Sequence, residues 1–313
     1  MSFFARSEGG RRVFVRGRAA AFACCGMLSC AAASQTPTAN PARPTLTNPA
    51  TLPPVGYVQL EQGYLGSLDS PETASQYGVN QTAKVAFSDR LMAEEQWQPW
   101  ARSREADADV GSNASGDLLI GAQAVLYNAP TPEDEAEKSD VHRHIFVPSA
   151  IPTIAAAYLE RVHSGTTPDV DLGGQARTAI FLFSGHSHLL RVHYDSNWIV
   201  SEQIGDSVDG SHSIRRAQFG ETISVDRELG NPNLQISLEV YHFSQPLVHA
   251  TATGKAAARA DLLDGLFALS YSVQPNLVLD CGFSHGFTST STRWQSFAGF
   301  TYLLPRRLWP GRN

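Results

Sequence analysis

From residue 55 onward, apolar and polar side chains alternate with a period of two along much of the chain. In the segment 233–244, for example, Leu234, Ile236 and Leu238 share one parity, and polar residues occupy most positions of the other. Consecutive side chains of an extended strand point to opposite faces of a sheet, whereas a helix would scatter each set around its circumference. The alternation therefore predicts β-strands with one apolar face and one polar face.

The alternating segments have the length of membrane strands. A tilted membrane-spanning strand needs about 9–11 residues, whereas strands in globular proteins average about 5–6. Most segments reach the longer figure, although 150–162 and 174–184 alternate poorly. We predict about twelve strands, over residues 56–65, 78–88, 91–100, 117–127, 150–162, 174–184, 188–199, 214–228, 233–244, 262–273, 276–287 and 293–304.

The connections between these segments alternate between short and long. Asp89-Arg90 and Gln274-Pro275 are tight turns, whereas 101–116 and 245–261 are long. Bacterial outer-membrane barrels have short turns on the periplasmic side and longer loops outside. The acidic stretch 128–149 breaks this rule, because it should be a tight turn, so it indicates an insertion or a different strand count there.

These observations predict an all-β fold, an antiparallel transmembrane β-barrel of outer-membrane type. The same periodicity also fits a soluble periplasmic β-sandwich or lipocalin-like barrel, in which the apolar faces would point inward. Strand length, an export signal and aromatic residues near strand ends favour the membrane, because aromatic girdles mark the two membrane interfaces. The aromatic residues in question are Trp97, Trp100, Trp198, Phe287, Trp294 and Tyr302.

The N-terminal region has the composition of an export signal. Within residues 1–33, five arginines precede a small apolar stretch, and Ala31-Ala32-Ala33 offers an A-x-A cleavage site. Residues 34–54 are rich in Pro, Thr, Ala and Asn, which predicts a flexible lead-in. We assign 55–305 to the barrel and 306–313 to a C-terminal tail, and we expect location in the outer membrane of a Gram-negative-type bacterium.

Composition and charge exclude some classes of function. The chain of 313 residues has 17% charged residues and no apolar run of 18 residues, so it has no membrane-spanning helix. Residues 1–33 hold five of the 24 basic residues and one of the 30 acidic ones, which leaves 19 against 29 in the remainder. An acidic body disfavours nucleic acid as a partner.

The C-terminal third resembles a family of outer-membrane transport channels. Residues 267–286, with a Pro-Asn turn between two strands, and the aromatic strand 293–305 are similar to the closing strands of the barrel family named after the meta-pathway of phenol degradation. Residues 116–121 and 193–198 are also similar to segments of this family. The resemblance covers 55–305, is specific in the last third, and implies transport of small compounds, including aromatic ones. The tail departs from the strand-terminal aromatic on which many such proteins end.

If the apolar faces contact lipid, the polar faces line a lumen. Such rows either tune selectivity or cross-link the wall, and the sequence leaves both roles open. Arg191, His193 and Asp195 share one parity, as a constriction or a wall network would require. The candidate lumen-lining residues are Lys84, Glu94, Arg191, His193, Asp195, Asn197, Asp226, Glu239, Asp264 and Asp280.

Catalysis and metal binding are weakly supported. The run 193–197 is one residue longer than the nucleophile segment of outer-membrane acyl hydrolases, and His193 and Ser196 would face opposite sides of a strand. We therefore expect no enzymatic activity, no metal and no cofactor. Two histidine pairs at predicted connections lack a cysteine partner and are expected to be solvated: His142 with His144, and His186 with His188.

The sequence thus favours an outer-membrane channel for small compounds, including hydrophobic or aromatic ones. Its expected partners are membrane lipid, a small-molecule solute and the outer-membrane assembly machinery. The alternatives are a barrel whose closed lumen serves structure or binding, and a soluble periplasmic β-protein. The direction in which the apolar rows face separates both barrels from the soluble protein.

Overall fold

The computed structural model describes residues 37–70, 73–105, 112–129, 152–162, 164, 175–187, 190–206, 213–244 and 261–309. Within these ranges no helix is long and apolar enough to cross a membrane. The strands are β1 (Val58–Leu68), β2 (Thr73–Ser88), β3 (Leu91–Glu105), β4 (Ser112–Ala114), β5 (Leu118–Tyr127), β6 (Thr153–Val162), β7 (Gln175–Ser187), β8 (Val192–Asp206), β9 (Ser213–Leu229), β10 (Asn231–Phe243), β11 (Leu262–Gln274), β12 (Leu277–Gly286) and β13 (Trp294–Leu303).

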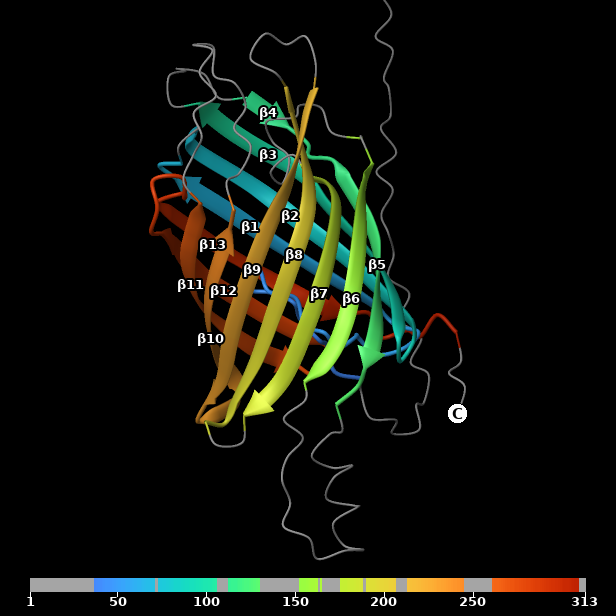
Figure 1. Cartoon of the computed structure of the whole chain (residues 1–313). Coiled ribbons are helices and arrows are strands. Elements are labelled where there is room, and N and C mark those ends of the chain that lie inside the picture. The colour runs from blue at the N-terminus through green and yellow to red at the C-terminus, as the bar shows by residue number, and fades with distance from the viewer. Residues whose placement is uncertain are drawn as a thin grey trace, which may run out of the picture. The chain divides into compact units, whose positions relative to one another are not determined.

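The strands form a closed antiparallel barrel (Figure 1). Each long strand pairs with its neighbours in the sequence, and β1 pairs with β13 to complete the ring. The short β4 pairs with the far part of β3, beyond the part that pairs with β5. Twelve strands therefore make the wall, which confirms the predicted fold class, and closure leaves no strand edge facing lipid.

Because consecutive strands run in opposite directions, every second connection lies at the same end of the barrel. At one end, which we call the turn end, the connections are residues 89–90, 188–191, 230 and 275–276. The stretch between β5 and β6 also belongs to this end and is long; residues 130–151 of it lie outside the described part.

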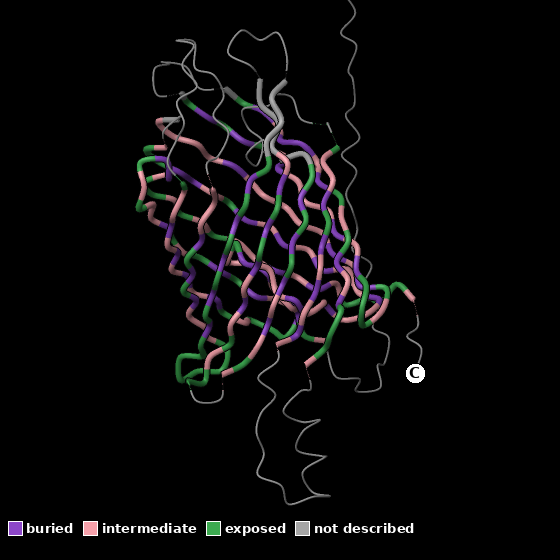
Figure 2. The backbone as a smooth tube through the Cα atoms, viewed as in Figure 1, coloured by how far each residue is buried: buried purple, intermediate pink, exposed green. Residues whose placement is uncertain are grey.

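Burial alternates along the strands (Figure 2). Most of the buried side chains, which face inward, are polar, and large apolar side chains are exposed on the outer face. Gln59 and Thr301 have exposed fractions of 0%, whereas Trp198 and Phe219 are each 59% exposed. This is the orientation of a membrane barrel, whose outer face contacts hydrocarbon, and the opposite of a soluble β-sandwich. Further apolar residues exposed on the outer face include Ile120, Phe181, Ile223, Leu238, Leu279 and Phe283.

One arc of the wall, formed by β5 to β8, carries many apolar side chains on the inner face as well as the outer face. Tyr158 and Phe181 are exposed on the outer face of β6 and β7, while their chain neighbours are buried on the inner face. Two-sided apolarity removes the alternation, which explains why 150–162 and 174–184 alternate poorly and still form strands. The inward members of this apolar arc are Leu119, Val125, Ala155, Ala157, Leu159, Ile180, Leu182 and Ile199.

Candidate functional site

Nearly all of the predicted lumen residues lie on the inner face of the wall. The strand register shows this directly, because Lys84 stands opposite Glu94 and Asp195 stands opposite Ser224, with all four side chains buried. The structure buries eight of the candidates on this face: Lys84, Glu94, Asp195, Asn197, Asp226, Glu239, Asp264 and Asp280.

Arg191 and His193 lie at the turn end and are not buried, unlike the other eight candidates. His193, near the start of β8, stands between His186 of β7 and Asp226 of β9 in the register. Arg191 lies in the turn before β8 with a φ of 52°, so it does not continue the row of His193 and Asp195. Some tight turns contain a residue with positive φ. The alternation of apolar and polar residues carries no signal for such a residue, so it did not identify Arg191 as part of a turn.

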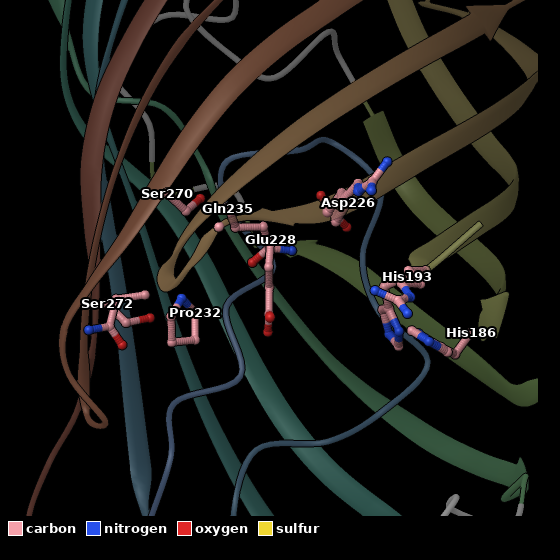
Figure 3. A pocket seen from close by; sticks show the side chains of 12 residues that line it. His186, His193, Asp226, Glu228, Pro232, Gln235, Ser270 and Ser272 are labelled. Carbon is pink, nitrogen blue, oxygen red and sulfur yellow. The ribbon is translucent and has the colours of Figure 1, made fainter. Parts of the chain in front are cut away.

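A cavity of about 730 Å³ occupies the turn end of the lumen (Figure 3). Both cationic and anionic side chains line it, so its charge is mixed. A cavity of this size has the volume of a small-molecule site. Its lining residues are His186, Arg191, His193, Asp226, Arg227, Glu228, Gly230, Pro232, Asn233, Gln235, Ser270 and Ser272.

Residues 37–54, which we call the strap, run along the inner face of the wall. The sequence predicts a flexible lead-in at 34–54, but the described part of it makes hydrogen bonds to inward side chains of β1, β5, β7, β9, β10 and β12. Figure 1 shows this segment in blue within the ring of strands. The strap therefore lies inside the lumen and contacts most of its circumference.

Arg43 joins the strap to β12. Its Nη2 lies 3.1 Å from Asp280 Oδ1, and its Nε donates to Asp280 Oδ2 at 3.3 Å. The two contacts form a bidentate pair, the geometry in which a guanidinium binds a carboxylate most specifically. Asp280 is nearly fully buried, with 1% of its side chain exposed, so this pair lies largely outside solvent.

Two glycines leave room for that guanidinium. In the register, Gly63 of β1 and Asp280 of β12 both stand opposite Gly299 of β13. A Cβ placed on Gly63 would lie 2.2 Å from the guanidinium of Arg43, and one placed on Gly299 would lie 2.8 Å from it. We call Gly63, Gly299 and Asp280 the guanidinium niche.

Glu239 of β10 holds the middle of the strap. Its carboxylate accepts hydrogen bonds from the backbone N–H groups of Leu46 (2.8 Å) and Thr47 (2.7 Å) and from the Thr47 hydroxyl. The Thr47 hydroxyl also lies 2.7 Å from the hydroxyl of Thr222 on β9. A buried carboxylate is stable only with such donors, so the strap satisfies a group that the bare wall would leave unpaired.

A third carboxylate, Glu61 of β1, contacts both the wall and the strap. Lys84 Nζ lies 2.9 Å from Glu61 Oε1, and Gln59 Nε2 donates to the same oxygen at 2.8 Å. The backbone N–H of Ala42 also donates to it, at 3.2 Å. Gln59 in turn accepts a hydrogen bond from the backbone N–H of Asn40 and donates to its carbonyl.

The second half of the strap meets the other side of the wall. The backbone N–H of Ala50 donates to Ser184 Oγ on β7 at 2.6 Å, and Gln123 Nε2 on β5 donates to the carbonyls of Pro49 and Ala50. Ala50 is fully buried in the cluster of the apolar arc, and Leu52 packs against that cluster. The strap thus presents donors to the acidic side and apolar groups to the arc.

Two small cavities lie between the strap and the described part of the wall. Their volumes are about 40 Å³ and 10 Å³. A space of about 10–15 Å³ is needed for one water molecule, so these two cavities hold a few waters at most. The larger one has Asp226, Gln235 and Ser270 in common with the turn-end cavity, which is itself lined by residues of the wall and its turns.

The wall around the strap is acidic. In the described strands, Lys84 is the only lysine or arginine among the buried residues, against seven carboxylates. All of these groups except Glu61 are predicted lumen residues; Glu61 has the same parity as the inward Gln59 of β1, and this parity is the signal that identifies it. The seven are Glu61, Glu94, Asp195, Asp226, Glu239, Asp264 and Asp280.

The described residues hold no group of three His, Cys, Asp or Glu side chains that could bind a metal ion. His142, His144 and His188 lie outside the described residues. Within β8, His193 stands opposite Asp226, whereas Ser196 stands opposite Ile223, whose side chain is exposed on the outer face. His193 and Ser196 therefore lie on opposite faces of the wall, and the imidazole does not reach the hydroxyl.

No family model matches the chain, and no curated protein sequence matches it. Solved outer-membrane barrels are similar in structure. An outer-membrane channel from Pseudomonas putida F1 has a TM-score of 0.53 and 10% identity, over 82% of this chain and 98% of that one. The NanC porin has a TM-score of 0.47 and 9% identity, over 79% of this chain and 100% of that one. At such identities the similarity shows the outer-membrane type of barrel fold.

Proposed function

We propose that this protein is an outer-membrane channel for small compounds, including hydrophobic or aromatic ones. The observation that carries the proposal is the inside-out barrel, with apolar side chains facing out and a polar lumen that holds a cavity of about 730 Å³. An outward apolar band suits hydrocarbon, and an inward polar surface suits a solute path. Membrane lipid and the assembly machinery that inserts such barrels are its proposed partners.

The apolar arc supports the wider solute range. Leu159, Ile180 and Leu182 face inward, so one side of the barrel interior is apolar while the other carries carboxylates. Ala50 of the strap covers this apolar side, so a solute would contact it where the strap is displaced. The proposal of hydrophobic or aromatic solutes rests on this arc and on the resemblance of the C-terminal strands.

A closed barrel with a structural role is the second candidate, because the strap lies across the lumen. Conductance in a planar lipid bilayer distinguishes the two. The purified, full-length protein should first show heat-modifiable migration on a gel, which establishes a folded barrel. Stepwise conductance then supports the channel, whereas a folded barrel that stays silent at every voltage supports the closed barrel.

A further inference from the structure

We propose that the strap is a gate that closes the solute path, and that the guanidinium niche it occupies is a binding site for solutes with a guanidinium or ammonium group. This inference rests on the proposed channel function. In this proposal the strap does more than fill space. Arg43 and the backbone N–H groups of Leu46 and Thr47 occupy the positions beside Asp280 and Glu239 at which a cationic solute would bind.

The contacts of the strap are those of an internal ligand. Arg43 forms a bidentate pair with Asp280 beside two glycines. The three atoms nearest to a Cβ added at Gly63 all belong to Arg43, whereas at Gly299 the Gln62 carbonyl oxygen is nearest, at 2.4 Å, and Arg43 follows at 2.8 Å. A site shaped for one guanidinium by missing side chains is specific for that group and would accept it from another molecule.

The strap is also suited to leave. It has no strand or helix of its own, and its backbone N–H groups donate to wall side chains and, from Ala39, to the Pro275 carbonyl in a turn. Its departure therefore breaks these hydrogen bonds without opening the barrel ladder. Once the strap leaves, Glu239 loses the donors of Thr47, and Asp280 loses Arg43. Among the buried residues of the described strands, Lys84 is then the only lysine or arginine that faces these carboxylates. Carboxylates without partners at a pore wall favour cations, so the open channel should be cation-selective.

A reversible lock tests the gate. Thr47 and Thr222 have hydroxyl oxygens 2.7 Å apart, so cysteines at both positions can form a disulfide, whose S–S length is about 2.0 Å. In full-length protein with Cys24, Cys25, Cys30 and Cys281 each changed to Ser, the pair Thr47→Cys and Thr222→Cys should conduct when reduced and lose conductance when oxidised. Thr47→Cys alone is the matched control and should not respond to the oxidant.

Solute uptake tests the niche. Liposomes that contain the reduced protein should take up butylguanidinium faster than butylurea, a neutral analogue of similar size. Asp280→Asn should remove this preference while conductance persists. Glu160→Gln is the matched control, because Glu160 is a half-exposed carboxylate paired with Arg177 outside the lumen. It should keep the preference.

The outcomes separate the claims. Equal conductance of oxidised and reduced protein, with the disulfide present on a gel, overturns the gate but leaves the channel. Equal uptake of butylguanidinium and butylurea, or a preference that survives Asp280→Asn, overturns the niche as a cation site. Silence of every folded variant in both redox states overturns the channel itself and the gate with it.

Discussion

Arg43 and Asp280 form a bidentate ion pair although 237 positions separate them in the sequence. The pair fastens the strap to β12, which lies next to β13, the strand that pairs with β1. Asp280→Asn weakens it by removing the charge, and charge-assisted hydrogen bonds contribute about 1.5–3 kcal/mol. In a Thr47→Cys background whose four native cysteines are changed to Ser, this change should speed maleimide labelling of the cysteine about tenfold or more. An unchanged labelling rate would show that other contacts hold the strap.

Gly63→Ala offers a test that removes no charge. The added Cβ would lie 2.2 Å from the guanidinium of Arg43, and a contact this short forces the side chain out of the niche. Alanine suits a strand slightly better than glycine, so the wall should remain intact. We expect the same gain in labelling of Thr47→Cys as from Asp280→Asn, with unchanged heat-modifiable migration. If Gly63→Ala instead prevents the barrel from folding, the added Cβ clashes with the wall rather than with Arg43, and the prediction is wrong.

Lys84→Met should destabilise the barrel strongly. Lys84 and Glu61 expose only 5% and 3% of their side chains, so the change leaves Glu61 buried without its ion-pair partner. Breaking a buried pair from one side costs about 3–5 kcal/mol. The measurement is the midpoint of urea unfolding in detergent micelles.

Arg177→Met is the matched control for Lys84→Met. The Arg177–Glu160 pair exposes 58% and 45% of its side chains, and exposed pairs contribute about 0–1 kcal/mol. The double variant Lys84→Met and Glu61→Gln should recover part of the loss, since it removes both charges. Equal effects of Lys84→Met and Arg177→Met would contradict the burial of Glu61.

Ile223→Arg tests the outward orientation of the apolar rows. Ile223 lies near the middle of β9 with 52% of its surface exposed, so the arginine would face hydrocarbon. At the bilayer midplane such a charge costs about 2–4 kcal/mol, and near the interface about 0–1. Folding into lipid vesicles should therefore suffer far more from Ile223→Arg than from Leu229→Arg at the strand end. Similar losses at both depths would argue against a membrane around this barrel.

The wall could be predicted because its signal is local. Alternation within each strand gave the number of wall strands and the inward parity of Lys84, Glu239 and Asp280. It became weak only at β6 and β7, where Ala157 and Ile180 make the inner face apolar as well. Arg191 was placed in a strand because a turn residue with positive φ has no periodic signature.

The strap could not be predicted, because its partners are remote. Thr47 contacts Thr222 and Glu239, which lie 175 and 192 positions away, and no pattern within residues 34–54 encodes such contacts. Its proline-rich composition is typical of linkers, and a linker and a segment bound inside a lumen share that composition. Only the closed barrel brings the donors of the strap to the carboxylates.

The strap is covalently continuous with β1, and β1 is one side of the seam that β13 completes. Such an enclosed segment enters most easily before β1 and β13 pair, because after closure it would have to pass through the narrow lumen. Captured early, it brings counter-charge among acidic strands before they converge and lowers the mutual repulsion that opposes their final approach. Residues 37–54 would then act as an internal template around which the strands close.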